Sequence, residues 1–510
     1  GWTPATVIWD VPIAYNIPGF GVYEPVNYDG RFHGPVSVRV ALANSYNIPA
    51  VQTLDYVGIP ALLEALRDVG VTSLGDDPSR YGLSLTLGAG EVYLLEWTNA
   101  FATLANGGVY RPPYAIERIE RNGQVIEGYP YQVPEGEQVV DPDHAYLLAD
   151  ILSDTEARIP AFGRDSVLST SYPAAAKTGT TNDFRDNWTM GFTTEIAVGV
   201  WVGNTDNSPM VNVSGVTGAG PIWRGIMDGS QQWYPAQPFP RPPTIFEQNV
   251  CRDDGAEPSD YCLEHSEFYT EIFSRSQPPP SAENGLYRRL RVDQFTGLIA
   301  NNYCPDYVEE KLFIVLPNPS QLIDLRQFER DWLLNTEEGR AWAAERAIPL
   351  DRILEDPPEG ACGPDTPVPT LFIDAPQPGS EQSGTLVVFG SVDAPNFSHY
   401  VVDFGLGPDP EGWGVLQPPT YEPVRNGILG ELDLTPFENG EMTIRLVVYD
   451  TEGHSAERQV TFRVANPTPT PTPTSTPAPT SAPTSTPTPV TPTPTAPVEV
   501  TPSPESTDEG

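Results

Sequence analysis

Residues 174–193, AAAKTGTTNDFRDNWTMGFT, decide the fold class of the 510-residue chain. Three alanines lead into a short strand-like segment, 174–180, and two further apolar segments follow at 187–192 and 196–203. Because only a short turn separates the last two segments, they are predicted to be antiparallel strands. Helical patterns dominate the sequence before this point. Helices first and a run of antiparallel strands afterwards predict an α+β fold and not a doubly wound parallel sheet.

Helices are predicted on both sides of these strands. One opens at Ile59-Pro60 and closes at Gly70, a second runs from about Glu91 to Asn106, and a third follows Asp141-Pro142. Proline fits the first helical position and glycine often follows the last, so these residues mark the boundaries. A further helix is expected to begin near Pro221.

The chain is strongly acidic, with a formal net charge of −40 at pH 7. Such a surface repels phosphate backbones, so nucleic acid is not expected as a partner. The two lysines are Lys177 and Lys311, which leaves two candidates for chemistry that needs an amine. The histidines are scattered along the chain: His33, His144, His265, His399 and His454. Since they do not show metal-ligand spacing, and since no phosphate-binding glycine loop is found, neither a metal site nor a cofactor is expected.

Changes in composition divide the chain into four predicted parts. Residues 1–240 mix helices and strands, and residues 241–368 form a connector rich in proline and acidic residues. Residues 369–465 contain short strands with alternating polarity and no helical pattern, which predicts an immunoglobulin-like β-sandwich. Residues 466–510 consist mainly of proline, threonine and serine, 33 residues of 45, so a disordered tail is predicted.

The connector contains all the cysteines of the chain: Cys251, Cys262, Cys304 and Cys362. Their spacing differs from the CxxC pairs of zinc sites, so disulfide bonds are the favoured interpretation and unpaired thiols the alternative. Of the three connectivities, we favour Cys251–Cys262 with Cys304–Cys362. Disulfide bonds would place this region outside the reducing cytosol.

The segment Lys177-Thr178-Gly179-Thr180 combines a cation, two hydroxyl groups and a glycine on one predicted strand. The charge and the hydroxyls suit a peptide carboxylate, and glycine allows a substrate backbone to approach closely. A peptide laid against such a strand edge would bind by β-augmentation.

A second motif, Ser45-Tyr46-Asn47, precedes a proline, Pro49, that disfavours uninterrupted helix at this point. A serine and an asparagine two residues apart can both face one cleft from a loop between helices. Taken together, residues 174–193 resemble the lysine motif and following strands of penicillin-binding transpeptidases, and Ser45-Tyr46-Asn47 resembles their second motif.

The resemblance covers about residues 1–235 and extends to class A penicillin-binding proteins, the bifunctional wall synthases. It is carried by the stretches Gly1-Trp2-Thr3-Pro4-Ala5-Thr6, Asn27-Tyr28-Asp29-Gly30, Gly88-Ala89-Gly90-Glu91-Val92 and Val198-Gly199-Val200-Trp201-Val202-Gly203-Asn204. The stretch from Gly218 to Trp223 is similar to the 1C-like branch of that class. For residues 1–240 the resemblance implies a transpeptidase domain of the penicillin-binding protein and serine β-lactamase type, without its N-terminal part.

The resemblance also implies roles for the matching residues. Ser45 would relay a proton to the leaving D-alanine, Asn47 would hydrogen-bond the substrate amide, and Lys177 would sustain a positive field and assist Ser45. The substrate-binding residues would be Thr178, Gly179 and Thr180. The hydroxyls of the two threonines would hold the terminal carboxylate, and the backbone N–H of Thr180 would form half of an oxyanion hole.

The nucleophile of that family is the serine of an SxxK motif, which the printed sequence lacks. Family order places this motif just before the Gly1-Trp2-Thr3-Pro4 stretch, so we expect the serine to lie upstream of Gly1. A glycosyltransferase domain and a membrane anchor are expected further upstream. The printed chain alone is therefore expected to be inactive and not to be acylated by penicillin.

For the intact protein, the resemblance implies a serine-type DD-transpeptidase that cross-links D-Ala-D-Ala stem peptides of peptidoglycan and also binds β-lactams. It implies an extracytoplasmic place in the cell envelope, with contact to the membrane only through the upstream anchor. Two alternatives stay open. One is a non-catalytic cell-wall-binding protein, and the other is a DD-carboxypeptidase, which uses the same residues with water as the acceptor.

Overall fold

The three strands predicted from residues 174–203 form one antiparallel sheet in the computed structural model. They are β9 (Ala175–Thr180), β10 (Asp186–Phe192) and β11 (Ala197–Gly203), in the order β11-β10-β9. Lys177 on β9 lies opposite Met190 on β10. Because β9 is an edge strand of this sheet, one side of its backbone is left without a strand partner in the described part of the chain.

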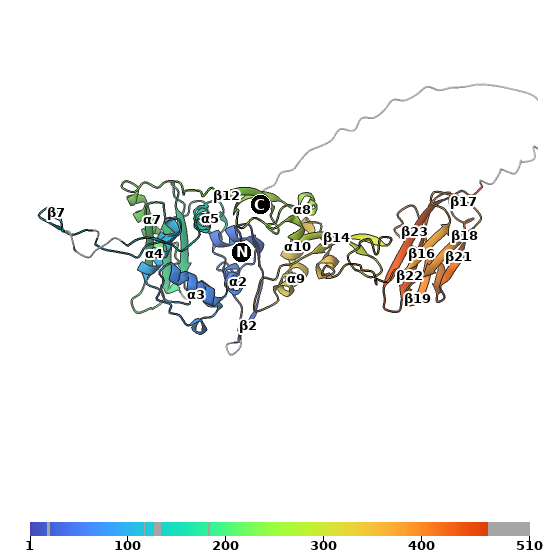
Figure 1. Ribbon diagram of the computed structural model, residues 1–510, viewed down its shortest axis with the longest axis horizontal. Coiled ribbons are helices and arrows are strands. Elements are labelled where there is room, and N and C mark those ends of the chain that lie inside the picture. The colour runs from blue at the N-terminus through green and yellow to red at the C-terminus, as the bar shows by residue number, and fades with distance from the viewer. Residues whose placement is uncertain (18–20, 117, 127–133, 182–183, 468–510) are drawn as a thin grey trace, which may run out of the picture.

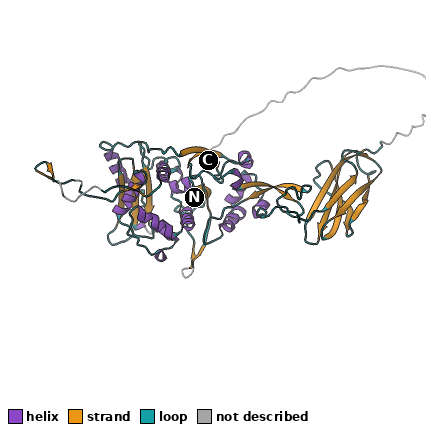
Figure 2. Ribbon diagram, in the orientation of Figure 1, coloured by secondary structure: helices purple, strands orange, loops and turns teal. Residues whose placement is uncertain are grey.

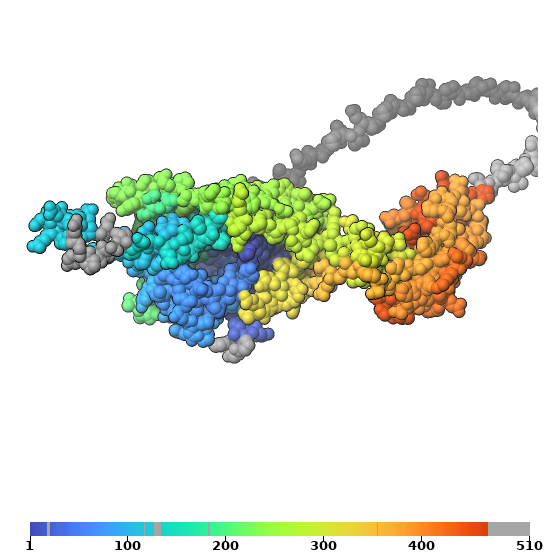
Figure 3. Space-filling view, in the orientation of Figure 1, coloured from blue at the N-terminus to red at the C-terminus, as the bar shows by residue number. Residues whose placement is uncertain are grey.

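The structure describes residues 1–17, 21–116, 118–126, 134–181 and 184–467. The molecule is elongated, with the β9–β11 sheet toward one end and a β-sandwich at the other (Figure 1). The space-filling view shows the sandwich as a separate lobe joined to the rest by a narrow neck (Figure 3). From residue 468 onward, the predicted tail lies outside the described residues.

Helices cover both faces of the β9–β11 sheet (Figure 2). On one face lies α7 (Ala219–Ser230), whose Trp223 packs in a core with Ala176 of β9. On the other face Ala175 packs with residues of α4 (Leu94–Ala105) and α5 (Pro142–Ser153). Successive side chains of a strand point to opposite faces, so two neighbouring alanines serve both cores. The predicted α+β class is confirmed.

The N-terminal segment places the second motif next to this sheet. Strand β1 (Val7–Asp10) pairs with β4 (Gly34–Ser37), and β4 runs directly into α1 (Val38–Asn44). Helices α2 (Asn47–Val57) and α3 (Ile59–Asp68) follow. The remaining elements of residues 1–240 are β2 (Tyr15–Ile17), β3 (Gly21–Tyr23), η1 (Pro78–Arg80), η2 (Leu83–Leu87), β5 (Val109–Tyr110), β6 (Glu120–Arg121), β7 (Gln124–Val125), β8 (Glu137–Gln138) and α6 (Ile159–Phe162).

The region expected as a connector has secondary structure and shares a core with the N-terminal segment. Its elements are β12 (Ile245–Cys251), α8 (Asp260–His265), β13 (Phe268–Ser274), η4 (Ala282–Asn284), β14 (Tyr287–Asp293), β15 (Val308–Ile314), α9 (Leu325–Asn335), α10 (Glu337–Glu345) and η5 (Leu350–Leu354). Trp332 and Leu333 of α9 pack in the same buried cluster as Trp9 and Ile48 from the N-terminal segment. The connector therefore supports the N-terminal segment, while the predicted boundary at residue 240 stays a prediction.

The four cysteines form two disulfide bonds in the structure. These bonds are Cys251–Cys262 and Cys304–Cys362, the connectivity that the sequence analysis favours. The first joins the end of β12 to α8, and the second joins residues on either side of β15 and α9. Both bonds lie inside the connector, so they stabilise the region that packs against the N-terminal segment.

Residues 370–464 form two β-sheets packed around one core. One sheet has the order β16-β18-β21 and the other β17-β23-β22-β19-β20. The strands are β16 (Thr370–Ala375), β17 (Glu381–Gln382), β18 (Thr385–Asp393), β19 (Phe397–Leu406), β20 (Gly414–Thr420), β21 (Val424–Asp433), β22 (Gly440–Asp450) and β23 (Ser455–Val464). This is a β-sandwich, and its assignment as immunoglobulin-like stays a prediction.

Among the described residues, none of the helices is both long enough and apolar enough to cross a membrane.

Candidate active site

Ser45 occupies a sharp turn between α1 and α2. It caps the C-terminus of α1 with φ 60° and ψ 40°, the left-handed region, and its N–H bonds back to carbonyl oxygens of that helix. A non-glycine residue in this conformation costs about 1–2 kcal/mol. Because the turn reverses the chain between two helices, it presents the Ser45 side chain toward β9. Backbone strain of this kind clusters at functional sites.

Lys177 brings the two sequence motifs together. Its Nζ donates a hydrogen bond to Ser45 Oγ at 2.7 Å and another to the carbonyl oxygen of Thr178 at 2.7 Å. Ser45 and Lys177 are 132 residues apart in the sequence, so only the packing of α1 beside β9 creates this contact. An amine and a hydroxyl at this distance can exchange a proton directly.

Burial lowers the pKa of Lys177 to about 8, with the positive charge of Arg158 as a second cause. The ordinary pKa of lysine is about 10.4, so a measurable fraction of the amine, about a tenth, is neutral at pH 7. A neutral amine accepts a proton, whereas the protonated form attracts a carboxylate. Lys177 therefore has both forms available near physiological pH.

The Thr178-Gly179-Thr180 segment is held from one face by a loop that precedes α7. Gly215 N donates to Thr180 Oγ1 at 2.9 Å, and Thr189 Oγ1 donates to the Gly215 carbonyl at 2.9 Å. A Cβ at position 215 would lie 2.7 Å from the carbonyl oxygens of Gly179 and Trp188. Only glycine fits there, because any side chain would push against the backbone of β9 and β10.

Asn47 begins α2 directly after the turn. Its Nδ2 donates to the Val26 carbonyl at 2.8 Å, and its backbone N donates to Asn27 Oδ1 at 2.8 Å. The structure therefore shows Asn47 anchored to the Val26–Asn27 segment. Its expected bond to a substrate amide stays a prediction.

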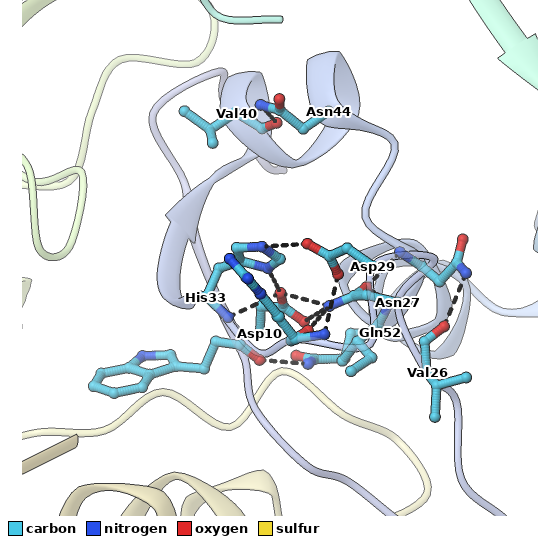
Figure 4. Close-up of polar contacts among 12 residues, drawn as sticks. Asp10, Val26, Asn27, Asp29, His33, Val40, Asn44 and Gln52 are labelled. Atoms are coloured by element: carbon cyan, nitrogen blue, oxygen red, sulfur yellow. Dashed lines mark hydrogen bonds and ion pairs between the residues drawn. The ribbon is translucent and has the colours of Figure 1, made fainter. Parts of the chain in front are cut away.

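Asn27 links this helix start to a buried carboxylate (Figure 4). Its Nδ2 donates to both oxygens of Asp10, at 2.8 and 2.7 Å, and to the Arg31 carbonyl at 2.8 Å. Its Oδ1 accepts from the backbone N of Asn47 and, at 3.2 Å, of Ile48. A side chain with five contacts fixes the position of α2 relative to β1.

His33 joins the same network between two carboxylates (Figure 4). Its Nδ1 lies 2.5 Å from Asp10 Oδ2, and its Nε2 lies 3.1 Å from Asp29 Oδ2. Its ring also stacks on Tyr46, with ring centroids 3.9 Å apart. Burial raises the pKa of Asp10, while bonds from Asn27 and His33 act in the opposite direction. The stacking contact with His33 thus also fixes Tyr46, the residue between Ser45 and Asn47.

Sequence reasoning singled out Asn27-Tyr28-Asp29-Gly30 as a family-like turn but assigned it no role. Its contacts with Asp10 and Asn47 depend on pairing between segments that are distant in sequence. Arg158 was missed entirely, because nothing in its local sequence marks an arginine that becomes buried.

A cluster of Asp450, Glu452 and His454 in the sandwich brings three ligand-type atoms within 4.8 Å. However, Asp450 Oδ1 accepts the backbone N–H groups of Glu452 and His454, and its Oδ2 contacts His454 Nδ1. The oxygens of Asp450 are therefore already bonded within the turn between β22 and β23.

Comparison with known proteins identifies the class to which this geometry belongs. The transpeptidase family model, described as the penicillin binding protein transpeptidase domain, matches residues 4–228. Penicillin-binding protein 1A of Aquifex aeolicus is 38% identical over 228 residues, covering 44% of this chain and 30% of that protein. Penicillin-binding protein 1C of Escherichia coli is 28% identical over 321 residues, covering 61% of this chain and 38% of that protein.

A crystal structure of penicillin-binding protein 1A from Haemophilus influenzae aligns with a TM-score of 0.47 at 25% identity, covering 55% of this chain and 46% of that one. The matches to the Aquifex and Escherichia proteins span about a third of those relatives' own length. Residues 4–228 belong to the penicillin-binding protein transpeptidase family. The resemblance drawn from the sequence is thereby confirmed.

Proposed function

We propose that this chain carries the peptide-binding cleft of a serine-type DD-transpeptidase that cross-links peptidoglycan stem peptides ending in D-Ala-D-Ala. The observation that supports it most directly is the 2.7 Å contact between Lys177 Nζ and Ser45 Oγ, which joins the two motifs at an edge strand. Membership of the transpeptidase family supports the same class of reaction.

The substrate's terminal carboxylate would bind at β9. Lys177 supplies the charge, and Thr178 supplies a hydroxyl. Because Thr180 Oγ1 accepts its hydrogen bond from Gly215 N, the proton of that hydroxyl remains to be donated to the carboxylate. The peptide backbone would add along the free edge of β9 as a further strand, beside Gly179.

Proton transfer would run through Ser45 and Lys177. When the nucleophilic serine attacks the D-Ala-D-Ala carbonyl, the amide C–N bond breaks and D-alanine leaves with a proton relayed by Ser45. The protonated form of Lys177 can return a proton to Ser45 Oγ, and the neutral form can take up the proton that the nucleophilic serine gives up. In the second step the amine of a neighbouring stem peptide attacks the ester, returns a proton to Ser45 and releases the serine, which leaves a cross-link.

Residues 1–510 contain no SxxK motif. The nucleophilic serine of the proposed reaction would therefore come from sequence outside these residues. β-Lactams would acylate that same serine in the intact protein. The expected glycosyltransferase activity, membrane anchor and cell-envelope location also remain proposals for the intact protein.

Reversible binding to this chain tests the cleft without needing the nucleophile. An N-acetylated tripeptide ending in D-Ala-D-Ala should bind, as measured by isothermal titration calorimetry, at least about tenfold tighter than the same peptide with a C-terminal amide, because the amide cannot pair with Lys177. Lys177→Met should weaken binding of the acid by a similar factor. Lys311→Met is the matched control, since Lys311 lies in the connector beside Glu309 and Glu355.

Equal affinity for the acid and the amide, or an unaffected Lys177→Met variant, would contradict the proposed cleft. A fluorescent penicillin should label the intact protein and leave a polypeptide of residues 1–510 unlabelled. Reversible peptide binding without any penicillin labelling of the intact protein would instead support the cell-wall-binding alternative. Release of free D-alanine without cross-linked dimers would support the carboxypeptidase alternative.

A further inference from the structure

Arg158 is a buried cation directly behind β9. It is 2% exposed and lies at the N-terminus of α6. Its guanidinium donates to the carbonyl oxygens of Leu168 and Ala176, at 3.2 and 3.3 Å, and to that of Leu152. These three carbonyls come from α5, from the segment after α6 and from β9. One planar group with several donors thus connects three chain segments. One of the carbonyl oxygens that it binds belongs to Ala176, the residue before Lys177.

Among the described residues, no carboxylate forms an ion pair with Arg158. Asp154 at the C-terminus of α5 acts on Arg158 through its negative field, but Asp150 and Asp154 both bind Arg39 of α1, at 2.7 and 3.1 Å. Arg39 also binds Glu271 at 2.6 Å. A buried charge that has only carbonyl partners costs several kcal/mol, on the order of the penalties for unpaired buried ions. Charged groups that burial perturbs in this way cluster at functional sites.

The carboxylates of Asp186 and Asp143, on two elements packed against β9, have partners of their own. Asp186 on β10 accepts from Trp201 Nε1 at 2.8 Å and from Thr181 Oγ1 at 3.2 Å. Asp143 at the start of α5 accepts from Thr244 and Ser274, and His144 follows it on the same helical turn. Arg158 is therefore the charge that acts on Lys177 from behind, and it lowers the pKa of that amine.

We propose that Arg158 is a positioning residue for the Ser45–Lys177 pair, which fixes the main chain of β9 at Ala176 and keeps a permanent positive charge behind the lysine. The inference rests on the proposed function, in which Lys177 must both attract a carboxylate and accept a proton. One amine cannot do both in one protonation state. Arginine does not lose its proton in proteins, so the site stays positive while Lys177 is neutral.

The test uses the two lysines of the chain. With lysine labelled by ¹³C at Cε, NMR should show one resonance for Lys177 and one for Lys311, and their titrations give both pKa values without any substrate. In the wild-type chain Lys177 should titrate near pH 8. Arg158→Met should move that midpoint upward by at least about 0.5 pH unit, since a nearby like charge is removed. Lys311 serves as the internal reference.

Arg164→Met is the matched control, because Arg164 follows α6 at the surface, where it pairs with Glu156. This variant should leave the Lys177 midpoint unchanged. An unchanged midpoint in Arg158→Met would overturn the electrostatic part of the proposal, whatever the chain does with peptides. A cleft that fails to bind peptide while the Lys177 midpoint still responds to Arg158 would reject the proposed function and keep this inference.

Arg158→Lys covers the case in which Arg158→Met does not fold. This variant keeps a cation but loses the fork that binds several carbonyls. Because the positive charge is kept, we expect the Lys177 midpoint to stay within about 0.5 pH unit of the wild-type value. The β9 amides should exchange with deuterium at least about tenfold faster than in the wild-type chain. Unchanged exchange of β9 would overturn the positioning part.

Discussion

Removal of the Asn27 side chain should loosen the start of α2 and with it the Ser45-Tyr46-Asn47 turn. Asn27→Ala deletes the donor to the Asp10 carboxylate, the donor to Arg31 O and the acceptor for the N–H groups of Asn47 and Ile48. Asn27 is 4% exposed, so water does not replace these bonds easily. A charge-assisted bond contributes about 1.5–3 kcal/mol and each neutral bond about 1 kcal/mol. With one charge-assisted bond and three neutral bonds lost, the expected total is about 4.5–6 kcal/mol.

Hydrogen exchange measured by mass spectrometry checks this value locally, which suits a chain with several structural parts. A loss of about 4.5 kcal/mol corresponds to exchange of the α2 amides that is faster by on the order of a thousandfold. The β-sandwich amides should be unaffected. Asn106→Ala is the control: Asn106 is exposed and its amide makes one bond, to Val109 O at 3.1 Å. If Asn27→Ala accelerates α2 exchange less than about tenfold, the network does not hold the motif.

Three further outcomes are expected. Gly215→Ala should weaken binding of the acid-terminated peptide, because its Cβ would press on the Gly179 and Trp188 carbonyl oxygens. Gly225→Ala in α7 is the control, because its Cβ meets no atom within 4 Å, and it should raise stability by up to about 1 kcal/mol. Calorimetry of both variants compares them. Lys177→Met should raise the free energy of unfolding at pH 7, because the folded state binds the Lys177 proton less tightly than the unfolded state does. That penalty is present in full below pH 8 and is relieved between about pH 8 and 10.4, so urea titrations of wild type and variant should converge across this window, and a constant difference would argue against a lowered pKa. Replacing both Cys304 and Cys362 by serine should destabilise the connector by about 4 kcal/mol, and the same change at Cys251 and Cys262 should destabilise it by about 3 kcal/mol. The difference arises because the Cys304–Cys362 bond closes a loop of 58 residues and the Cys251–Cys262 bond a loop of 11. Thermal unfolding would rank the two variants, and the reverse order would refute the loop-entropy argument.

Much of the local structure could be predicted from the sequence, because it follows from local patterns. The turn between β10 and β11 is predicted by two apolar segments with a short spacer, and Pro60 with Gly70 marks the helix that the structure shows as α3. The alternating strands of the sandwich follow from period-two polarity. In contrast, the connector was expected from its proline and acidic content, and its place in the core with Trp9 and Ile48 could not be predicted, since composition says nothing about which distant segment a side chain meets.

The sequence by itself determined that a lysine, two threonines and a glycine share one strand, that a serine lies on a turn before Pro49, and that Lys177 is one of two amines available for chemistry. The tertiary structure decided that Lys177 reaches Ser45, that Asn27 ties α2 to Asp10, and that Arg158 lies buried behind β9. The physical reason is that strand and turn preferences act over a few neighbouring residues. Desolvation and the field of a buried charge depend on segments that come together only when the chain has folded.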